Sequence, residues 1–314
     1  MQNNKVVMLA LIALPLTFSL NANASTGSTD YSFNGLSLSA SLGSLSGKSQ
    51  EYVYDSESGR KMSQLDWRIK NAPIVNGEVN YDFLSWLSLN GRGWVTLGKS
   101  KTTMDDYDCL DPFQSNWTDW SHHENTHLNY GNELDLNLRA WIMQKQNYKL
   151  GLVAGYQRNS YSWRAVGGCY QYENGSEIGC FVNDDGGIGY QQKFNTPYVG
   201  LSGKYVINNF EFNALLKFSD WANAQDRDEH YSRGLTFKER GQNSKFYSAT
   251  IDAGYHFTQS TKLFAAASYN HYSKGLADTE IIDNMTGERA YFNNAAGISN
   301  KSYILSLGIQ YLFG

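Results

Sequence analysis

Two short acidic motifs contain the residue types of a proton-transfer site. Asp106 and Asp108 are two residues apart and share one face if their segment is extended. Adjacent carboxylates raise the pKa of one member, so such a couple can hold a proton or orient a water molecule. Asp228 and His230 have the same spacing, and an aspartate that orients a histidine gives a general base. Each motif is weak alone, because acidic loops also bind calcium or simply face solvent.

A third motif, His123–His127, reads H-E-x-x-H, the zinc signature of metalloproteases. Zinc binding needs the two histidines one helical turn apart. The following segment, 128–132, opens a strand instead, and no helical stripe of apolar residues surrounds the motif. In an extended chain the two imidazoles lie about 13 Å apart, too far to share a metal. We therefore expect no metal site and interpret the motif as a coincidence in a segment rich in His and Asn.

The elements that must position these residues have a hydrophobic period of two. Period two is typical of strands with one apolar and one polar face. In one segment Leu65, Trp67 and Tyr81 fall on one face, and Glu78 and Asp82 on the other, if the alternation is uninterrupted. The clearest alternating segments are 36–42, 65–81, 133–140, 210–218 and 303–313.

Short and long connections alternate between these segments. The short ones fall near 82–85, 144–147, 207–209 and 258–261. The long, polar ones fall near 49–61, 99–125, 168–186, 223–244 and 274–299. This is the pattern of an outer-membrane barrel, with short turns on one side and long loops on the other. The sequence thus predicts an all-β fold: a ten-stranded antiparallel transmembrane β-barrel with five long extracellular loops.

Charged residues occupy one face of each predicted strand. These charged residues must line the interior of the barrel, while the apolar face contacts an apolar environment, as in a membrane barrel. We expect Glu133, Asp135, Glu211 and Lys217 to form ion pairs in that interior. The strand predicted over 62–81 is about 65 Å long, or about 45 Å when tilted, against an apolar band of about 25 Å. The barrel should therefore stand well above the membrane.

Composition and the N-terminal residues agree with an exported barrel. Lys and Arg number 26 against 30 Asp and Glu, which excludes a polybasic nucleic-acid binder. Residues 1–24 contain Lys5, an apolar run and an A-x-A motif ending at Ala24, which predicts a secretory signal peptide. The barrel domain is then 25–314. That domain has no run of 18 apolar residues, so a helical membrane protein is excluded.

The chain has three cysteines, an odd number for an exported protein. Cys169 and Cys180 flank a segment rich in Gly and Asn, as the two halves of a loop-closing disulfide would. Cys109 is left free if those two pair. The sequence leaves the pairing open.

In this barrel context the motifs together resemble the omptin family of outer-membrane proteases, along essentially the whole mature length. The resemblance is closest to the plasminogen-activator branch of that family, through segments 105–108 and 218–221. The segments that carry the family resemblance are 45–48, 59–61, 63–67, 104–108, 117–119, 128–130, 155–157 and 226–231.

The resemblance implies an aspartic endopeptidase in the outer membrane of a Gram-negative bacterium, with its active site facing the exterior. Carried over by position, Asp106 and Asp108 are the catalytic aspartate couple, and Asp228 and His230 are the catalytic Asp–His pair. His230 would take a proton from a water molecule that the couple positions. No metal or other cofactor enters this chemistry.

The resemblance also implies the substrate class. Glu51 and Asp226 match the acids that hold a basic side chain, so we expect polypeptides to be cleaved after Arg or Lys, dibasic sites included. Asp119, Ser121 and His123 match accessory polar positions of the groove.

Lipopolysaccharide is implied as a requirement for activity. Tyr156 and Lys193 match positions that bind it, although Arg158 and Ser160 stand where the family tends to have Glu and Arg. The alternative to a protease is a non-catalytic outer-membrane barrel, acting as an adhesin or a small porin.

Overall fold

The computed structural model describes residues 35–182 and 187–313. The predicted signal peptide, residues 1–24, lies outside this part of the chain. No helix in the described residues is long and apolar enough to cross a membrane.

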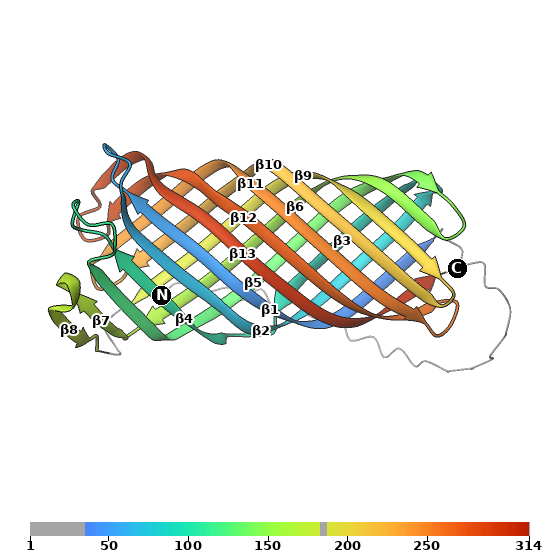
Figure 1. Cartoon of the computed structure of the whole chain (residues 1–314), viewed down its shortest axis with the longest axis horizontal. Coiled ribbons are helices and arrows are strands. Elements are labelled where there is room, and N and C mark those ends of the chain that lie inside the picture. The colour runs from blue at the N-terminus through green and yellow to red at the C-terminus, as the bar shows by residue number, and fades with distance from the viewer. Residues whose placement is uncertain (1–34, 183–186, 314) are drawn as a thin grey trace, which may run out of the picture. The chain divides into compact units, whose positions relative to one another are not determined.

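Antiparallel strands close into a ring (Figure 1), which confirms the predicted all-β barrel. β1 pairs with β13, while β3 and β4 follow one another along the same position of the ring, between β2 and β5. The ring has ten positions in the described residues. They are filled by β1 (Leu36–Tyr54), β2 (Lys61–Leu84), β3 (Leu87–Thr96) with β4 (Ser100–Asp108), β5 (Asp119–Gln144), β6 (Tyr148–Val166), β9 (Ile188–Ile207), β10 (Phe210–His230), β11 (Leu235–His256), β12 (Thr261–Asp283) and β13 (Arg289–Phe313).

A small hairpin lies outside the ring, in the connection between β6 and β9. It consists of β7 (Cys169–Tyr172), the 3₁₀ turn η1 (Glu173–Gly175) and β8 (Glu177–Cys180), and it pairs with β5. Cys169 and Cys180 are register partners in it and form a disulfide. Cys109 is buried and free. We call the barrel end that carries this hairpin, where β4 ends at Asp108 and β10 at His230, the distal end.

The two faces of the strands differ as the alternation predicts. On β5, Leu134 and Leu136 are 56% and 54% exposed, whereas Asp135 between them is fully buried. In the interior, Asp135 pairs with Lys217, and Glu211 with Lys262. The predicted ion-paired lumen is confirmed for these residues.

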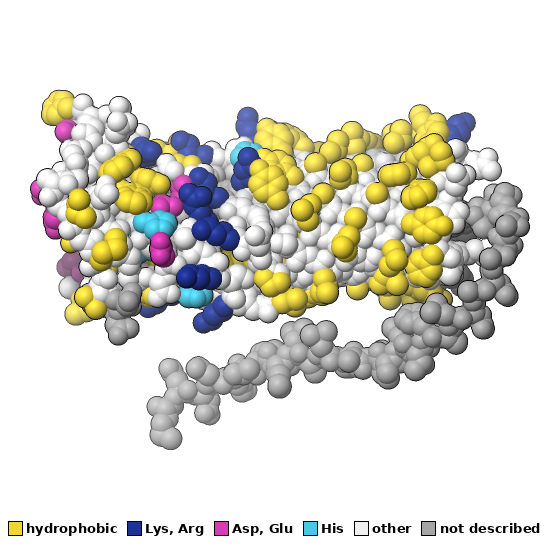
Figure 2. Space-filling view, turned by 60° about the horizontal axis from the view of Figure 1, so that its bottom comes forward, with side chains coloured by type: hydrophobic (Ala, Val, Ile, Leu, Met, Phe, Trp, Pro, Cys, Tyr) yellow, Lys and Arg dark blue, Asp and Glu magenta, His cyan; other side chains and the backbone are white. Residues whose placement is uncertain are grey.

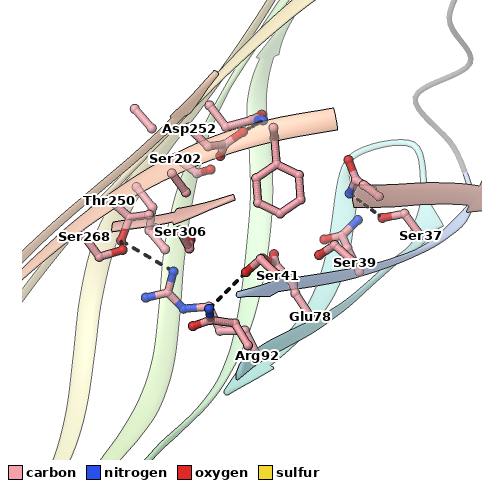
Figure 3. Close-up of a pocket in the computed structure, with 18 of the residues that line it drawn as sticks. Ser37, Ser39, Ser41, Glu78, Arg92, Ser202, Thr250, Asp252, Ser268 and Ser306 are labelled. Carbon is pink, nitrogen blue, oxygen red and sulfur yellow. Dashed lines mark hydrogen bonds between the residues drawn. The ribbon is translucent and has the colours of Figure 1, made fainter. Parts of the chain in front are cut away.

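This interior contains a polar cavity on the side of the barrel away from the distal end. Its wall is formed by hydroxyl and charged side chains from many strands (Figure 3). Arg92, for example, reaches across to Thr250, and Asn76 donates a hydrogen bond to Ser41. Such hydrogen bonds, within the wall and across the lumen, allow polar side chains to face the interior.

The alternation in β2 is interrupted, so the prediction of one continuous register from Leu65 to Tyr81 is wrong. Asn71 has a positive φ of 46°, and the β1–β2 pairing shifts at this point. Such a bulge moves every following side chain to the other face. Leu65 and Trp67 therefore face the interior, where they are buried, while Val79 faces outside.

The inward turn of these residues creates an apolar cluster inside the distal half of the barrel. Leu65 is the register partner of both Glu51 and Asp106, so the cluster directly adjoins the predicted site residues. It gives that site a rigid apolar wall. Its members are Leu45, Leu65, Trp67, Ile69, Ala72, Ile74, Trp94, Met104, Leu128, Tyr161, Trp163, Ala165, Tyr190 and Ile304.

The boundaries predicted for the long connections are wrong, because the strands continue through most of them. The segment predicted as a loop over 223–244 forms the ends of β10 and β11, which are joined by residues 231–234 alone. These strand ends are polar on both faces, since they lie beyond the apolar outer wall. A segment that is polar on both faces shows no alternation, so the sequence predicts a loop there. Figure 2 shows hydrophobic side chains along most of the outer wall and charged ones gathered toward the distal end. β2 has 24 residues, so it is at least as long as the strand predicted over 62–81.

Candidate active site

The aspartate couple lies at the distal end of β4. Asp106 and Asp108 face the interior, next in line after the buried Met104. Asp105, which lies between Met104 and Asp106 in the sequence, faces outside. Its carboxylate lies 2.6 Å from Nδ1 of His122. Ser63 on β2 donates a hydrogen bond to Oδ1 of Asp106 (3.2 Å). The predicted shared face of the couple is thus present, on a strand and not on a loop.

Asp228 and His230 form a hydrogen-bonded pair at the distal end of β10. Nε2 of His230 lies 2.7 Å from Oδ2 of Asp228, and Asp228 is buried. The imidazole and the ring of Phe237 on β11 form a T-shaped pair, with 5.3 Å between centroids. Nδ1 of His230 points toward Arg233, whose Nη1 is 3.4 Å away. The carboxylate and Phe237 together fix the orientation of the ring.

The couple and the pair belong to opposite walls of the barrel. β5, β6 and β9 separate β4 from β10 on one side, and β2, β1, β13, β12 and β11 on the other. Their charges nevertheless interact, Asp106 with Asp228 and Asp108 with His230. The four groups are therefore close enough across the distal lumen for their charges to interact.

These groups lie beyond the apolar outer wall, and burial shifts their ionisation. Burial raises the pKa of Asp106 well above its usual value, and the adjacent charge of Asp108 raises it further. Burial also raises the pKa of Asp108. A couple with raised pKa values keeps a proton to higher pH, so it can both donate to and accept from a water molecule.

A second acidic group lies on the interior side of the pair. Glu51 on β1 is 2% exposed, and Asp226 on β10 shares the interior face of Asp228. The hydroxyl of Tyr190 donates to Oδ2 of Asp226 (2.9 Å), and its ring stacks on Trp67 at 5.1 Å. Burial raises the pKa of Asp226 to about 7. We name Glu51 and Asp226 the acidic pocket, and Tyr190 and Leu65, which adjoin these acids, belong to the apolar cluster.

The accessory residues predicted on β5 are brought to the same end of the barrel. Oγ of Ser121 lies 2.9 Å from Nε2 of His123, and Nδ1 of His123 lies 2.5 Å from the carbonyl oxygen of Gly167. Asp119 accepts a hydrogen bond from the hydroxyl of Thr118 (2.6 Å). Burial lowers the pKa of His123, so its imidazole stays neutral over a wider pH range. These residues thus lie on the part of the distal end that β5 forms.

The H-E-x-x-H motif lies on strand β5, as the sequence predicts. The β4–β5 register shifts between His123 and Thr126, so Thr126 is buried in the interior, and the next residue, His127, faces outside. The two histidines consequently point to opposite faces of the barrel wall. This geometry is incompatible with one zinc ion held by both.

The residues predicted to bind lipopolysaccharide lie on the outer wall, away from the acidic groups. Tyr156 on β6 is exposed, and its hydroxyl donates to Oδ1 of Asn195 on β9 (3.1 Å). Lys193 is two residues from Asn195 and so shares its outward face. Arg158 is the register partner of Asn195. An aromatic and two basic side chains thus share one patch of the wall.

Sequence reasoning missed several residues of the site. Ser63, Tyr190, Arg233 and Glu239 contact its acids or its histidine, and none carries a motif of its own. Ser63 lies within the segment 63–67 that carried the family resemblance. Glu239 was missed because its segment was predicted to be a loop. Its position opposite Asp226 follows only from the β10–β11 register.

Known proteins with the same architecture were found at the level of family, sequence and structure. The model of the omptin family matches residues 32–313. The plasminogen activator of Yersinia pestis is 47% identical over 310 residues, covering 98% of this chain and 99% of that protein. The outer membrane protease OmpP of Escherichia coli strain K12 is 39% identical over 312 residues, covering 96% and 98%. The crystal structure of the Escherichia coli outer membrane protease OmpT matches with a TM-score of 0.87 and 38% identity, covering 92% of this chain and 100% of that one.

Proposed function

Since this chain belongs to the omptin family and is an outer-membrane endopeptidase, we propose that it cleaves after Arg and Lys with a water molecule activated between its Asp–His pair and its aspartate couple. The observation that carries this proposal is the 2.7 Å hydrogen bond from His230 to Asp228, on the wall opposite Asp106 and Asp108. The alternative of a non-catalytic adhesin or porin loses its support, because the relatives are proteases.

His230 acts as the general base in this proposal. Its Nε2 is occupied by Asp228, so Nδ1 is the nitrogen left to take a proton from water. Arg233, 3.4 Å from Nδ1, must then move aside when a substrate binds. The carboxylate of Asp228 stabilises the imidazolium that forms, as carboxylates do for histidine bases in general.

The aspartate couple positions the attacking water. A couple that shares one proton donates a hydrogen bond through one oxygen and accepts through another, which fixes the water in one orientation. Attack on the scissile carbonyl carbon gives a tetrahedral intermediate. His230 then returns its proton to the leaving amine, the C–N bond breaks, and the histidine is again neutral.

Substrate selection follows from the acidic pocket. Glu51 and Asp226 are buried beside the catalytic pair, and no Lys or Arg side chain within the described ranges forms an ion pair with either of them. A guanidinium or ammonium group that entered would supply the missing donors. A neutral side chain would leave these acids unpaired, and this loss is the basis of discrimination.

We propose in addition that lipopolysaccharide is required for activity and binds at Tyr156 and Lys193. An exposed aromatic side chain beside basic groups on the outer wall suits a phosphorylated lipid headgroup. Bound lipid there would brace β6 and β9, and β9 carries Tyr190, which contacts Asp226. In this way, lipid bound on the outer wall would affect the position of Asp226 in the acidic pocket.

The central experiment is cleavage of a fluorogenic peptide containing Arg-Arg by the refolded protein, with products identified by mass spectrometry. We expect cleavage at the basic residues in the presence of lipopolysaccharide. A parallel peptide with citrulline in place of both arginines keeps the shape and removes the charge. Equal cleavage of the two peptides would overturn the proposed specificity. If neither peptide is cleaved, the proposal that the protein cuts the bond after a basic residue is wrong.

A further inference from the structure

The hairpin between β6 and β9 carries aromatic side chains that no step of the proposed mechanism uses. This hairpin lies at the distal end (Figure 1), and its first strand, β7, continues the sheet beyond β5. Tyr170 of β7 is the register partner of Ser121, which is buried on the interior face of β5. Directly opposite residues of two paired strands share a face. Tyr170, and Tyr172 two residues later, therefore face the lumen side of the distal end.

The rings on this face form one continuous row. His123 of β5 stacks on Phe181 with 5.6 Å between centroids, and Phe181 lies 5.0 Å from Tyr170. Tyr170 in turn stacks on Tyr172 at 4.4 Å. Gly179, opposite Tyr170 in the hairpin, leaves room for this ring, because a Cβ atom there would lie 2.5 Å from the tyrosine hydroxyl. We call His123, Phe181, Tyr170 and Tyr172 the aromatic row.

The hairpin that carries most of the aromatic row is held in place at both of its ends. The disulfide between Cys169 and Cys180 closes its base. At its turn, the backbone N–H of Glu173 donates a hydrogen bond to Oδ1 of Asp119 on β5 (2.9 Å). The rings are thus ordered before any ligand arrives, which lowers the entropy cost of binding to them.

The aromatic row lies on the side of the aspartate couple that is away from Glu51. In the order of the sheet, β1 with Glu51 comes before β2 and β4, whereas the hairpin follows β5. Tyr172 is nevertheless close to the couple: burial and the charges of Asp106, Asp108 and Asp119 raise its pKa to about 12. A substrate whose basic side chain lies at Glu51 therefore extends toward the row with the residues that follow the cleaved bond.

The spacing of the strands indicates which substrate residue meets the row. β4 pairs with β5, and β5 pairs with β7, so β4 and β7 lie about 10 Å apart at about 4.8 Å per strand. An extended peptide that crosses these strand ends advances about 3.3 Å per residue. The first residue after the cleaved bond thus faces Asp119 and Ser121 on β5, and the aromatic row meets about the third.

We propose that the aromatic row is a subsite for a large apolar side chain, aromatic above all, about three residues after the cleaved bond. This inference rests on the function proposed above. A side chain packed on the row removes apolar surface of both partners from water. Ring pairs also stabilise each other beyond the effect of the buried area, which favours an aromatic residue over an aliphatic one. A small polar residue gains neither contribution.

The first test is a set of peptides that share Arg-Arg and differ at one of the five residues after the cleaved bond. Phe, Leu, Lys or Ser is placed at each of these positions in turn, in a background of Gly and Ser. At the third residue we expect kcat/KM for Phe to exceed that for Ser by about tenfold or more, with Leu between the two. A preference for Lys at that residue would instead indicate a site for a cation and would contradict the proposal.

Variants of the hairpin identify the surface that is responsible. Tyr170→Ala removes a middle ring of the row and should reduce the preference for Phe over Ser to about threefold or less, through KM and not kcat. Ile178→Ala is the matched control, because Ile178 is 72% exposed opposite Gln171, on the face away from Tyr170, and should keep the preference. The double substitution Cys169→Ser, Cys180→Ser opens the hairpin and should weaken the preference. The preference for arginine over citrulline at the cleaved position should persist in all of these variants.

The outcomes separate this inference from the proposed function. If the wild-type protein prefers arginine to citrulline but not Phe to Ser at any of the five positions, the inference is refuted and the proposed function stands. If it shows no preference for arginine over citrulline, the proposed function itself fails. If Tyr170→Ala and the disulfide variant both keep the preference for Phe, another surface binds that side chain. If Tyr170→Ala slows cleavage of all peptides equally, the ring has a structural role and the inference is wrong.

Discussion

Nε2 of His230 lies 2.7 Å from Oδ2 of Asp228, two residues earlier on the same interior face of β10. Backbone alternation alone brings the two side chains together, because residues i and i+2 of a strand share a face. The carboxylate is buried, so it holds the ring in place and faces the developing imidazolium without competing water. This relationship is the basis of the proposed mechanism and of the first prediction.

Removal of any one of the four proposed catalytic groups should abolish most activity. We expect Asp106→Ala, Asp108→Ala, Asp228→Ala and His230→Ala each to lower kcat by about a hundredfold or more, as loss of a general base or of its water-positioning partner does. The measurement is the rate of cleavage of the Arg-Arg peptide. Asp105→Ala, on the outer face of the same strand, is the matched control and should keep its activity.

Metal chelators should leave activity unchanged. The proposed mechanism uses no metal, and His123 and His127 point to opposite faces of β5. Activity is measured after dialysis against phenanthroline and then after addition of zinc. Loss with the chelator and recovery with zinc would contradict this mechanism.

Neutralising the acidic pocket should change which bond is cut. In Glu51→Gln and Asp226→Asn we expect the preference for Arg over uncharged residues at the cleaved position to fall by about a hundredfold, because the cation loses a buried partner. Product mapping by mass spectrometry on an unstructured protein substrate measures this directly. If both variants still cut only after basic residues and merely capture them more slowly at low salt, the acids belong to an attractive rim and not to a pocket.

The buried Asp226 should make the barrel less stable as the pH rises. Burial raises the pKa of Asp226 to about 7 in the folded protein, above its value in an unfolded chain. Folding therefore favours the protonated form, and this contribution to stability is lost as the pH rises toward and through 7. Asp226→Asn should raise the heat-denaturation midpoint at pH 8 and have a smaller effect at pH 5. A larger stabilisation at pH 5 than at pH 8 would show that the pKa is not raised.

Lipopolysaccharide should be needed for full activity. Lys193→Ala and Tyr156→Ala should raise the lipopolysaccharide concentration that gives half-maximal activity, because each removes an outer-wall contact to the headgroup. Titration of purified, detergent-solubilised protein with lipopolysaccharide measures that concentration. Lys101→Ala, an exposed lysine on β4, serves as the control. Full activity in pure detergent, unchanged on adding lipopolysaccharide, would remove the requirement.

Much of the fold could be predicted because a two-residue period is a local property. The alternation around Leu134 and Asp135 identifies a strand and its two faces without any knowledge of its neighbours. The alternating short and long connections then predict the ring of ten positions. The spacing of Asp106 with Asp108, and of Asp228 with His230, likewise predicts which side chains share a face.

The strand ends at the distal end could not be predicted by the same means. Beyond the apolar outer wall both faces of a strand are polar, so the ends of β10 and β11 read as a loop. The bulge at Asn71 was equally hidden, because one extra residue reverses the faces without a change in composition.

The sequence by itself determined the class of fold, the polar and apolar faces of unbroken strand segments, and the two residue pairs whose spacing places them on one face, since all of these follow from neighbours along one chain segment. Only the tertiary structure decided which strands stand beside and across from one another. Closure of the barrel brings Glu51 to Asp226, and the β10–β11 register places Glu239 beside them. The pocket is made by pairings between distant segments, and the free energy of those pairings depends on the whole closed sheet.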